Sequence, residues 1–235
     1  MLYTIHMKLA IVLPAYNEEK ILRSVLESLP KKLIGINNIY TVVTDDGSKD
    51  KTFAVAKKYA TIALRHKINL GTGSATITGI RYAMRKLKPD IIITMDSDGQ
   101  HDPKNVSALI KPIVNKKCDV VIGSRMLDSK GMPLIKIFTN KFANFITFIF
   151  SGIWASDTQT GFRAYNRKAL QKIKLRTTGY EYCTEVFAEL RRNGLKFIEV
   201  PVKVIYNDYS KAKGQSIDNS INVLIKLINR NLTKL

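Results

Sequence analysis

Short apolar segments alternate with segments of helical periodicity along the first half of the chain, and this alternation limits the possible folds more than any other feature. The expected strands are 9–13, 39–44, 61–64, 91–95 and 120–122. The expected helices, which carry apolar residues three and four positions apart, are 18–29, 50–59, 71–87 and 105–115. Strands that alternate with helices build a mostly parallel sheet with helices on both faces. We therefore expect an α/β, Rossmann-like fold.

The second half of the chain is less regular. Its expected elements are an apolar helix over 134–153, a polar loop over 157–165, an amphipathic helix over 180–193, a strand within 196–206, a basic loop over 207–215 and an amphipathic helix over 217–232. No internal repeat, low-complexity tract or linker divides the chain, so we expect one domain over residues 1–235.

The chain is strongly basic, with 38 Lys and Arg residues against 19 Asp and Glu residues and a formal net charge of +19. This charge favours an anionic partner, such as nucleic acid, acidic lipid or a phosphorylated substrate. A nucleic-acid-binding protein is the less favoured alternative, because no recognition motif is present and the acidic loops would repel phosphate. The two cysteines form no CxxC pair, which is typical of a reduced cytoplasmic setting, and the three scattered histidines show no zinc-site spacing.

The acidic motif at 96–100 carries the most chemical information. Asp96 and Asp98 follow the almost uniformly apolar segment 91–95, and Gln100 comes two residues later. Two carboxylates at a strand end can face one cleft, and Mg²⁺ is commonly held by one or two carboxylates together with substrate phosphates. An ordinary turn is the alternative, since Asp and Gly are frequent in turns.

Three more polar loops follow expected strands or open an expected helix. They are 14–19 (PAYNEE), 45–50 (DDGSKD) and 69–75 (NLGTGSA). Tyr16 could pack on a nucleobase, a carboxylate of the second loop could accept hydrogen bonds from one, and the glycine-rich helix start could bring N–H groups to phosphate. Each loop could equally be a turn with a helix cap. Loops that follow parallel strands gather at one sheet edge, where open α/β folds bind ligands.

Taken in their order, these motifs resemble the glycosyltransferase family 2 domain with the GT-A fold, and more narrowly the polyprenyl-phosphate (dolichyl-phosphate) mannose and glucose synthases. The resemblance extends over nearly the whole chain and rests on PAYNE, VVTDDGSKD, GTGSA, DSDGQH, Gly123-Ser124-Arg125, DTQTGFR, the segment 179–185 and Glu199-Val200-Pro201. It implies a nucleotide-binding half over about 1–125 and an acceptor half over about 126–235. Two departures are Ile217 after Gly214-Gln215-Ser216 in the late basic loop and a chain end without the transmembrane helices of some relatives.

By this resemblance the functional residues fall into three groups. The nucleotide would be bound by Pro14, Ala15, Tyr16, Glu18, Asp45, Asp46 and Gly73. The metal ion, Mg²⁺ or Mn²⁺, and the donor diphosphate would be held by Asp96, Asp98 and Gln100. Arg125 and Arg163 would contact the donor or acceptor phosphate or the sugar.

The resemblance implies an inverting transfer of a hexose from a UDP- or GDP-linked donor to a polyprenyl or dolichyl phosphate. A phosphate monoester needs no general base, because its second pKa is about 6 and it is largely dianionic at neutral pH. A hydroxyl acceptor is the alternative; it would need a base, for which Asp157 is the candidate. A nucleotidyltransferase is a further alternative, but 14–20 lacks the glycine-rich loop that such enzymes carry after the first strand.

Two amphipathic segments indicate how a lipid acceptor would be reached. Segment 134–154 carries six aromatic residues with Lys136 and Lys141 near its start, and segment 217–235 has an aliphatic face among basic residues. Neither supplies the roughly 20 apolar residues that a spanning helix needs, but both could lie in a headgroup layer. We expect a peripheral protein on the cytoplasmic face of an anionic membrane, with packing on the sheet or in a homo-oligomer interface as the alternative.

Overall fold

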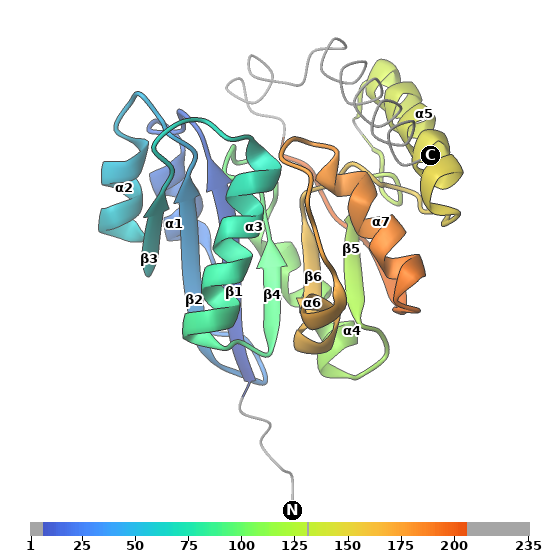
Figure 1. Cartoon of the computed structure of the whole chain (residues 1–235), viewed down its shortest axis with the longest axis horizontal. Coiled ribbons are helices and arrows are strands. Elements are labelled where there is room, and N and C mark those ends of the chain that lie inside the picture. The colour runs from blue at the N-terminus through green and yellow to red at the C-terminus, as the bar shows by residue number, and fades with distance from the viewer. Residues whose placement is uncertain (1–6, 131, 206–235) are drawn as a thin grey trace, which may run out of the picture.

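Strand β1 (Met7–Ala15) is an interior strand of the sheet in the computed structural model, which describes residues 7–130 and 132–205 (Figure 1). Its last seven residues are buried, as expected for a strand covered on both faces. β1 pairs in parallel with β2 (Ile36–Asp45) on one side and with β4 (Ile91–Thr94) on the other. The carboxyl ends of β1 and β4 therefore form the point at which the strand order changes direction, where open α/β folds bind ligands.

In the described part of the chain, seven strands form one sheet in the order β3-β2-β1-β4-β6-β5-β7. The remaining strands are β3 (Ile62–Arg65), β5 (Val120–Ser124), β6 (Arg163–Asn166) and β7 (Phe197–Pro201). β6 runs antiparallel to β4 and β5, and the other paired strands are parallel. The expected mostly parallel α/β sheet is confirmed.

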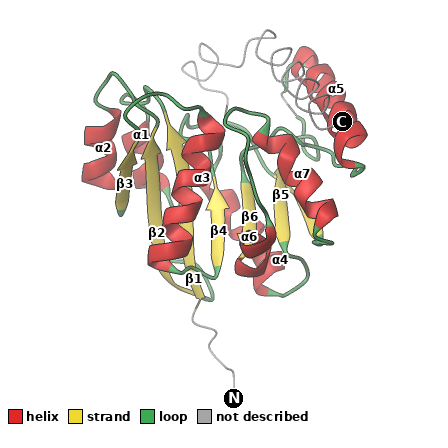
Figure 2. Ribbon diagram, in the orientation of Figure 1, coloured by secondary structure: helices red, strands yellow, loops and turns green. Residues whose placement is uncertain are grey.

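Helices cover both faces of this sheet (Figure 2). One layer consists of α1 (Leu22–Ser28), α2 (Thr52–Tyr59) and α4 (Val106–Val114), which the 3₁₀ turn η2 (Pro103–Asn105) precedes. The other consists of α3 (Thr72–Tyr82), its π-helical continuation η1 (Ala83–Leu87), α6 (Arg167–Lys172) and α7 (Tyr182–Arg192). Successive strand residues point to opposite faces, so Leu9 and Ile11 of β1 join the first core while Ala10 and Val12 join the second.

Helix α5 (Leu134–Ser151) does not belong to either layer. It stands beside α7, away from the strands (Figure 1). The helix expected over 134–153 is therefore confirmed, but it does not pack on the sheet. Across residues 7–130 and 132–205, every helix is too short or too polar to cross a bilayer.

The first helix begins later than its apolar spacing predicts, at Leu22 rather than residue 18. The backbone N–H groups of Asn17, Glu18 and Glu19 donate to the side chains of Ser48, Thr52 and Asp50. These bonds tie the start of the segment to the loop after β2, so it does not enter the helix.

The segment 157–165 also differs from the prediction of a polar loop. Its end forms the start of β6, and α6 follows directly although no helix was expected there. β6 is short and begins with a charged residue, but it lies between β4 and β5, so tertiary pairing decides its conformation. The loop expected over 207–215 and the helix expected over 217–232 lie outside the described residues.

Candidate active site

The polar loops after β1, β2 and β4 meet at the carboxyl edge of the sheet. The Ala15 carbonyl, at the end of β1, accepts a hydrogen bond from the backbone N–H of Asp46 at 2.8 Å. The Pro14 carbonyl accepts one from the Ser97 hydroxyl at 2.7 Å. Three motifs that lie far apart in the sequence are therefore in contact, as a parallel sheet predicts.

Asp96 is held between a histidine and a glycine. Its Oδ2 lies 2.9 Å from Nε2 of His101, whose buried ring packs on Phe162 at a centroid distance of 4.8 Å. A Cβ atom at Gly161 would lie 2.7 Å from Oδ2 of Asp96 and closer still to Oδ1. Gly161 thus leaves the space that the Asp96 carboxylate occupies.

Asp96 and Asp98 have opposite pKa shifts. Burial alone would raise the pKa of Asp96, but the hydrogen bond and charge of His101 hold it below its usual value, and the charges of Arg125 and Arg163 act in the same direction. Burial and the neighbouring Asp96 carboxylate raise the pKa of Asp98. The two carboxylates therefore repel each other in a half-buried place, and a divalent cation would relieve that repulsion.

These side chains fit a hard cation such as Mg²⁺ or Mn²⁺. Among the described residues, no three His, Cys, Asp or Glu side chains are grouped so as to hold a metal ion by themselves. Mg²⁺ does not require such a group, because it keeps several waters and takes oxygens from one or two carboxylates and from substrate phosphates. Asp98 accepts the backbone N–H of Gln100 at 2.9 Å, which keeps the predicted amide ligand next to the carboxylate pair.

Asp46 holds a neighbouring segment of the protein. Its carboxylate accepts the backbone N–H groups of Leu70 and Gly71 at 3.0 and 2.7 Å and lies 2.7 Å from Nδ1 of His66. The other ring nitrogen of His66 lies 3.0 Å from the Thr78 hydroxyl on α3. These bonds fix the segment before α3 through both oxygens of the buried Asp46 carboxylate, and the contact of Asp46 with a nucleobase stays a prediction.

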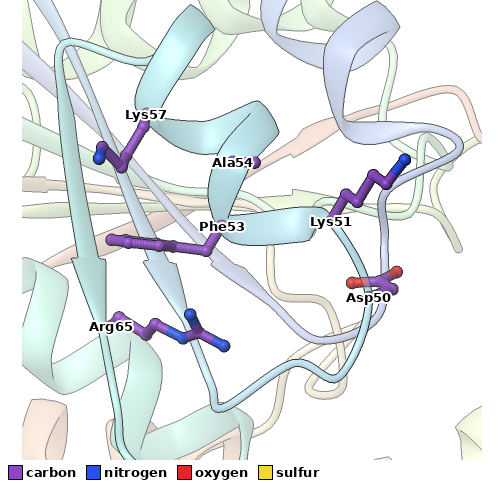
Figure 3. A pocket seen from close by; sticks show the side chains of 6 residues that line it. All are labelled: Asp50, Lys51, Phe53, Ala54, Lys57 and Arg65. Carbon is purple, nitrogen blue, oxygen red and sulfur yellow. The ribbon is translucent and has the colours of Figure 1, made fainter.

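Asp45 is buried as well and is paired with Arg65. The two side chains form an ion pair, Nε to Oδ2 at 3.1 Å, and Arg65 also donates to the Ser48 carbonyl at 3.0 Å. The Arg65 guanidinium lies 5.1 Å from the centre of the Phe53 ring. It thereby belongs to a pocket on α2 and β3 lined by Asp50, Lys51, Phe53, Ala54, Lys57 and Arg65 (Figure 3). This pocket lies at the edge strand of the sheet. Arg65 therefore stabilises the loop 45–50, which is predicted to bind the nucleoside, from the outer side of that loop.

The remaining predicted nucleoside residues lie at the end of β1 and just beyond it. Pro14 and Ala15 are buried strand residues. Glu18 is buried, and its backbone N–H donates to the Thr52 hydroxyl at 2.7 Å. Tyr16 is 38% exposed, which makes it the side chain of this group best placed to stack on a base.

The glycine-rich start of α3 is closed by another part of the backbone. The Ser74 N–H donates to the Thr178 carbonyl at 3.0 Å. A Cβ atom at Gly73 would lie 2.6 Å from the Gly179 carbonyl oxygen and 2.7 Å from that of Thr177. Gly73 is therefore needed for close packing, and its role in binding the nucleotide stays a prediction.

Asp157 and Arg125 form a buried ion pair. Asp157 accepts hydrogen bonds from the backbone N–H, Nε and Nη2 of Arg125 at 3.0, 2.6 and 2.8 Å. Burial alone would raise the pKa of Asp157, but the charge and hydrogen bonds of Arg125 outweigh it and lower that pKa. A fully buried carboxylate with a lowered pKa is poorly suited to take a proton from a hydroxyl, so the general-base role does not fit the structure.

Arg163 is also completely buried, which sequence reasoning did not predict. Its Nη1 donates to the Cys183 carbonyl at 3.1 Å and its Nη2 to the Thr158 carbonyl at 2.8 Å, and the guanidinium lies 5.3 Å from the centre of the Phe187 ring. Direct contact with phosphate or sugar does not fit this burial. The charge of Arg163 favours ionised Asp96, with a smaller effect on that pKa than His101 has.

Two histidines that the sequence interpretation left without a role each contact an aspartate of a predicted motif. His101 lies five residues after Asp96 in the same loop, and that proximity was a usable signal. His66 lies 20 residues after Asp46, and only the parallel pairing of β2 with β3 brings the two side chains together. The sequence therefore carried a signal for one of them and none for the other.

Residues 10–174 match the model of glycosyl transferase family 2, and the chain belongs to this family. It is 44% identical over 223 residues to an uncharacterized protein of Methanocaldococcus jannaschii, covering 93% of this chain and 90% of that protein. It is 36% identical over 240 residues to the UDP-N-acetylglucosamine--dolichyl-phosphate N-acetylglucosaminyltransferase of Methanococcus voltae, covering 93% and 94%. The chain is therefore a glycosyltransferase.

Solved structures support the fold independently. Glucosyl-3-phosphoglycerate synthase from Mycobacterium tuberculosis, in complex with Mn²⁺, UDP and phosphoglyceric acid, superposes with a TM-score of 0.69 at 20% identity. The match covers 95% of this chain and 78% of that one. At this identity the likeness concerns the fold, and it confirms the expected GT-A architecture.

Proposed function

We propose that this glycosyltransferase moves a sugar, with inversion, from a nucleotide-diphosphate donor to a polyprenyl or dolichyl phosphate. The observation that carries the proposal is the pair Asp96 and Asp98 at the end of β4, two carboxylates that repel each other beside the nucleoside motifs. The dolichyl phosphate in the name of the Methanococcus voltae relative supports the lipid acceptor. Its UDP-linked sugar makes a uridine donor the first to test, with GDP-linked hexoses as the alternative.

The metal would be held by Asp96, Asp98 and Gln100. When bound, a divalent cation neutralises the donor diphosphate and makes the nucleotide a better leaving group. The protein contributes the orientation of the ligands, since His101 fixes Asp96 from one side and Gly161 leaves room for it on the other. Such outer contacts to metal ligands commonly matter nearly as much as the ligands.

The state of Asp157 favours a phosphate over a hydroxyl acceptor. A hydroxyl would need a base, whereas the candidate base is buried and ion-paired with Arg125. A phosphate dianion needs only to be positioned and stripped of water. Arg125 keeps 20% of its side chain exposed, and a guanidinium suits phosphate contact, so Arg125 is the arginine we assign to that role.

A transfer assay with UDP-N-acetylglucosamine or GDP-mannose, a polyprenyl phosphate and Mn²⁺ or Mg²⁺ tests this function. We expect Asp96→Asn and Asp98→Asn to abolish transfer while the protein stays folded. Asp102→Asn is the matched control, because it alters a carboxylate of the same loop whose role is to cap η2, and Asn caps equally well. Full activity in EDTA or in either site variant would contradict the metal role.

The outer face of α5 supports a location at a membrane surface. Its exposed aromatic side chains are Phe138, Phe142, Phe145 and Phe148, followed by Trp154 just beyond the helix. An apolar stripe of this size on a basic protein suits insertion among anionic headgroups. The cytoplasmic face and a homo-oligomer stay predictions.

Flotation with phosphatidylglycerol vesicles at low salt tests the membrane location. The wild type should float with the vesicles, and a Phe142→Glu/Phe145→Glu double variant should not. Ile34→Glu is the control, since Ile34 is 99% exposed and lies far from α5 in the sequence, before β2. Equal flotation of all three proteins would remove α5 from the membrane contact.

A further inference from the structure

Helix α5 buries its polar side and exposes its aromatic side. The side chains that it buries are Asn144, Thr147 and Ser151, whereas Phe142, Phe145 and Phe148 are exposed. An ordinary surface helix shows the opposite arrangement, with its apolar stripe towards the core. The buried polar groups of α5 must therefore find partners in the protein, because an unpaired buried polar group is costly.

Asn144 has those partners in the turn 156–158. Its Nδ2 donates to the Ser156 carbonyl at 2.6 Å, and its Oδ1 accepts the backbone N–H and the hydroxyl of Thr158, both at 2.9 Å. Thr147, one turn later on α5, bonds to the Thr158 hydroxyl at 3.1 Å and to the Thr184 hydroxyl of α7 at 3.1 Å. The buried face of α5 thus forms hydrogen bonds with the residues immediately before and after Asp157.

The same turn is also held by β7. Glu199 accepts the backbone N–H of Ser156 at 2.9 Å and its hydroxyl at 2.7 Å. Asp157 lies in this turn, and it binds Arg125 through three hydrogen bonds. The position of Arg125 therefore depends on the turn, and the turn depends on α5.

We infer that Asn144 is a positioning residue for the transfer reaction: it fixes the 156–158 turn from α5 and thereby orients the Asp157–Arg125 pair toward the acceptor. This inference rests on the proposed function, in which Arg125 contacts phosphate. It also links the aromatic face of α5 with the site, because one helix carries both.

The variants are Asn144→Ala, which removes all three hydrogen bonds, and Asn144→Asp, which keeps the size and the acceptor but loses the donor to Ser156. Asn140→Ala is the matched control: it removes the same amide one turn earlier on α5, where the Asn140 Nδ2 lies 3.8 Å from the Met126 sulfur. Thermal unfolding verifies that each variant folds. Thr158→Val, which removes one hydroxyl at constant shape, replaces any Asn144 variant that does not fold.

Kinetics and hydrogen exchange are then read together. We expect Asn144→Ala to lower kcat/KM for polyprenyl phosphate about 10- to 100-fold, as a misplaced catalytic group does, while UDP binding by calorimetry stays unchanged. Exchange of the Arg125 amide, which is bonded to Asp157 and not to Asn144, should become faster. Asn140→Ala should change neither quantity.

Two results would overturn the inference. One is that Asn144→Ala and Asn140→Ala show the same exchange rate of the Arg125 amide and the same kcat/KM for the acceptor. The other is an equal loss of UDP binding and acceptor turnover, which indicates a general structural role. If the wild type transfers nothing to a polyprenyl phosphate, the proposed function fails, while the exchange of the Arg125 amide still reports on the positioning.

Discussion

Replacing Asp157 by Asn tests the electrostatics of the acceptor side. The substitution keeps the size of the side chain, but it removes a buried charge and turns an NH₂ group toward the Arg125 guanidinium, where Asp157 now accepts bonds at 2.6 and 2.8 Å. Removing one partner of a buried ion pair costs about 3–5 kcal/mol. Because Arg125 is 20% exposed and can be partly solvated, we expect a value near the lower end, about 3 kcal/mol.

The pH dependence follows from the direction of the pKa shift. Arg125 lowers the pKa of Asp157 in the folded protein against the opposing effect of burial, whereas the unfolded chain has the usual value of about 3.9. A lowered folded pKa contributes stability that is fully present above the unfolded pKa and is lost as the pH falls through the folded pKa. The stability difference between the wild type and Asp157→Asn should therefore be constant from neutral pH to about pH 5 and shrink below about pH 4.

Urea unfolding of both proteins at pH 7, 5 and 3.5 measures this difference. Asp102→Asn is a suitable control, because Asp102 caps η2 and forms no ion pair within the part of the chain that the structure describes. A difference that does not change with pH would mean that the pair stabilises through shape rather than charge. A difference near zero at pH 7 would refute the argument for the buried ion pair.

Two further substitutions test the glycines that the site requires. Gly161→Ala should weaken Mn²⁺ binding in the presence of UDP about 10- to 100-fold without loss of fold, because the new Cβ overlaps the Asp96 carboxylate. Unchanged Mn²⁺ affinity would show that Asp96 can move aside freely. Gly73→Ala should cost about 1–3 kcal/mol in urea unfolding, because its Cβ would meet two backbone carbonyls; a variant as stable as Ser74→Ala would refute that packing.

The strands of the parallel sheet could be predicted because they are buried on both faces. Segments such as 91–95 contain only apolar residues apart from one threonine, and few other structures require that pattern. The antiparallel strand β6 carries no such pattern, since it begins with Arg163 and follows a polar segment. Its conformation depends on two neighbouring strands that are remote in sequence, so local pattern could not show it.

The candidate site could be predicted in its position but less well in the roles of single residues. Loop chemistry and strand order place Asp45, Asp46, Asp96 and Asp98 at one edge, and the structure agrees. Burial was not predictable, because it depends on what packs above each side chain. Arg163 is a charged residue in a polar motif, a setting typical of a ligand contact, yet Tyr182 and Phe187 of α7 cover it completely.

The pairing of the carboxylates at this edge distinguishes Asp98 from its neighbours. Four of the carboxylates are paired with an arginine or a histidine: Asp45 with Arg65, Asp46 with His66, Asp96 with His101 and Asp157 with Arg125. Among the residues described in the structure, no Lys, Arg or His forms an ion pair with Asp98, and its pKa is raised by burial and by Asp96. The chain has a net charge of +19, yet this half-buried carboxylate has no cation beside it in the described part of the chain, and that arrangement lowers the stability of the folded protein. It is consistent with a site in which a bound metal ion supplies the balancing positive charge, so Asp98→Asn should abolish transfer without lowering the stability of the free protein.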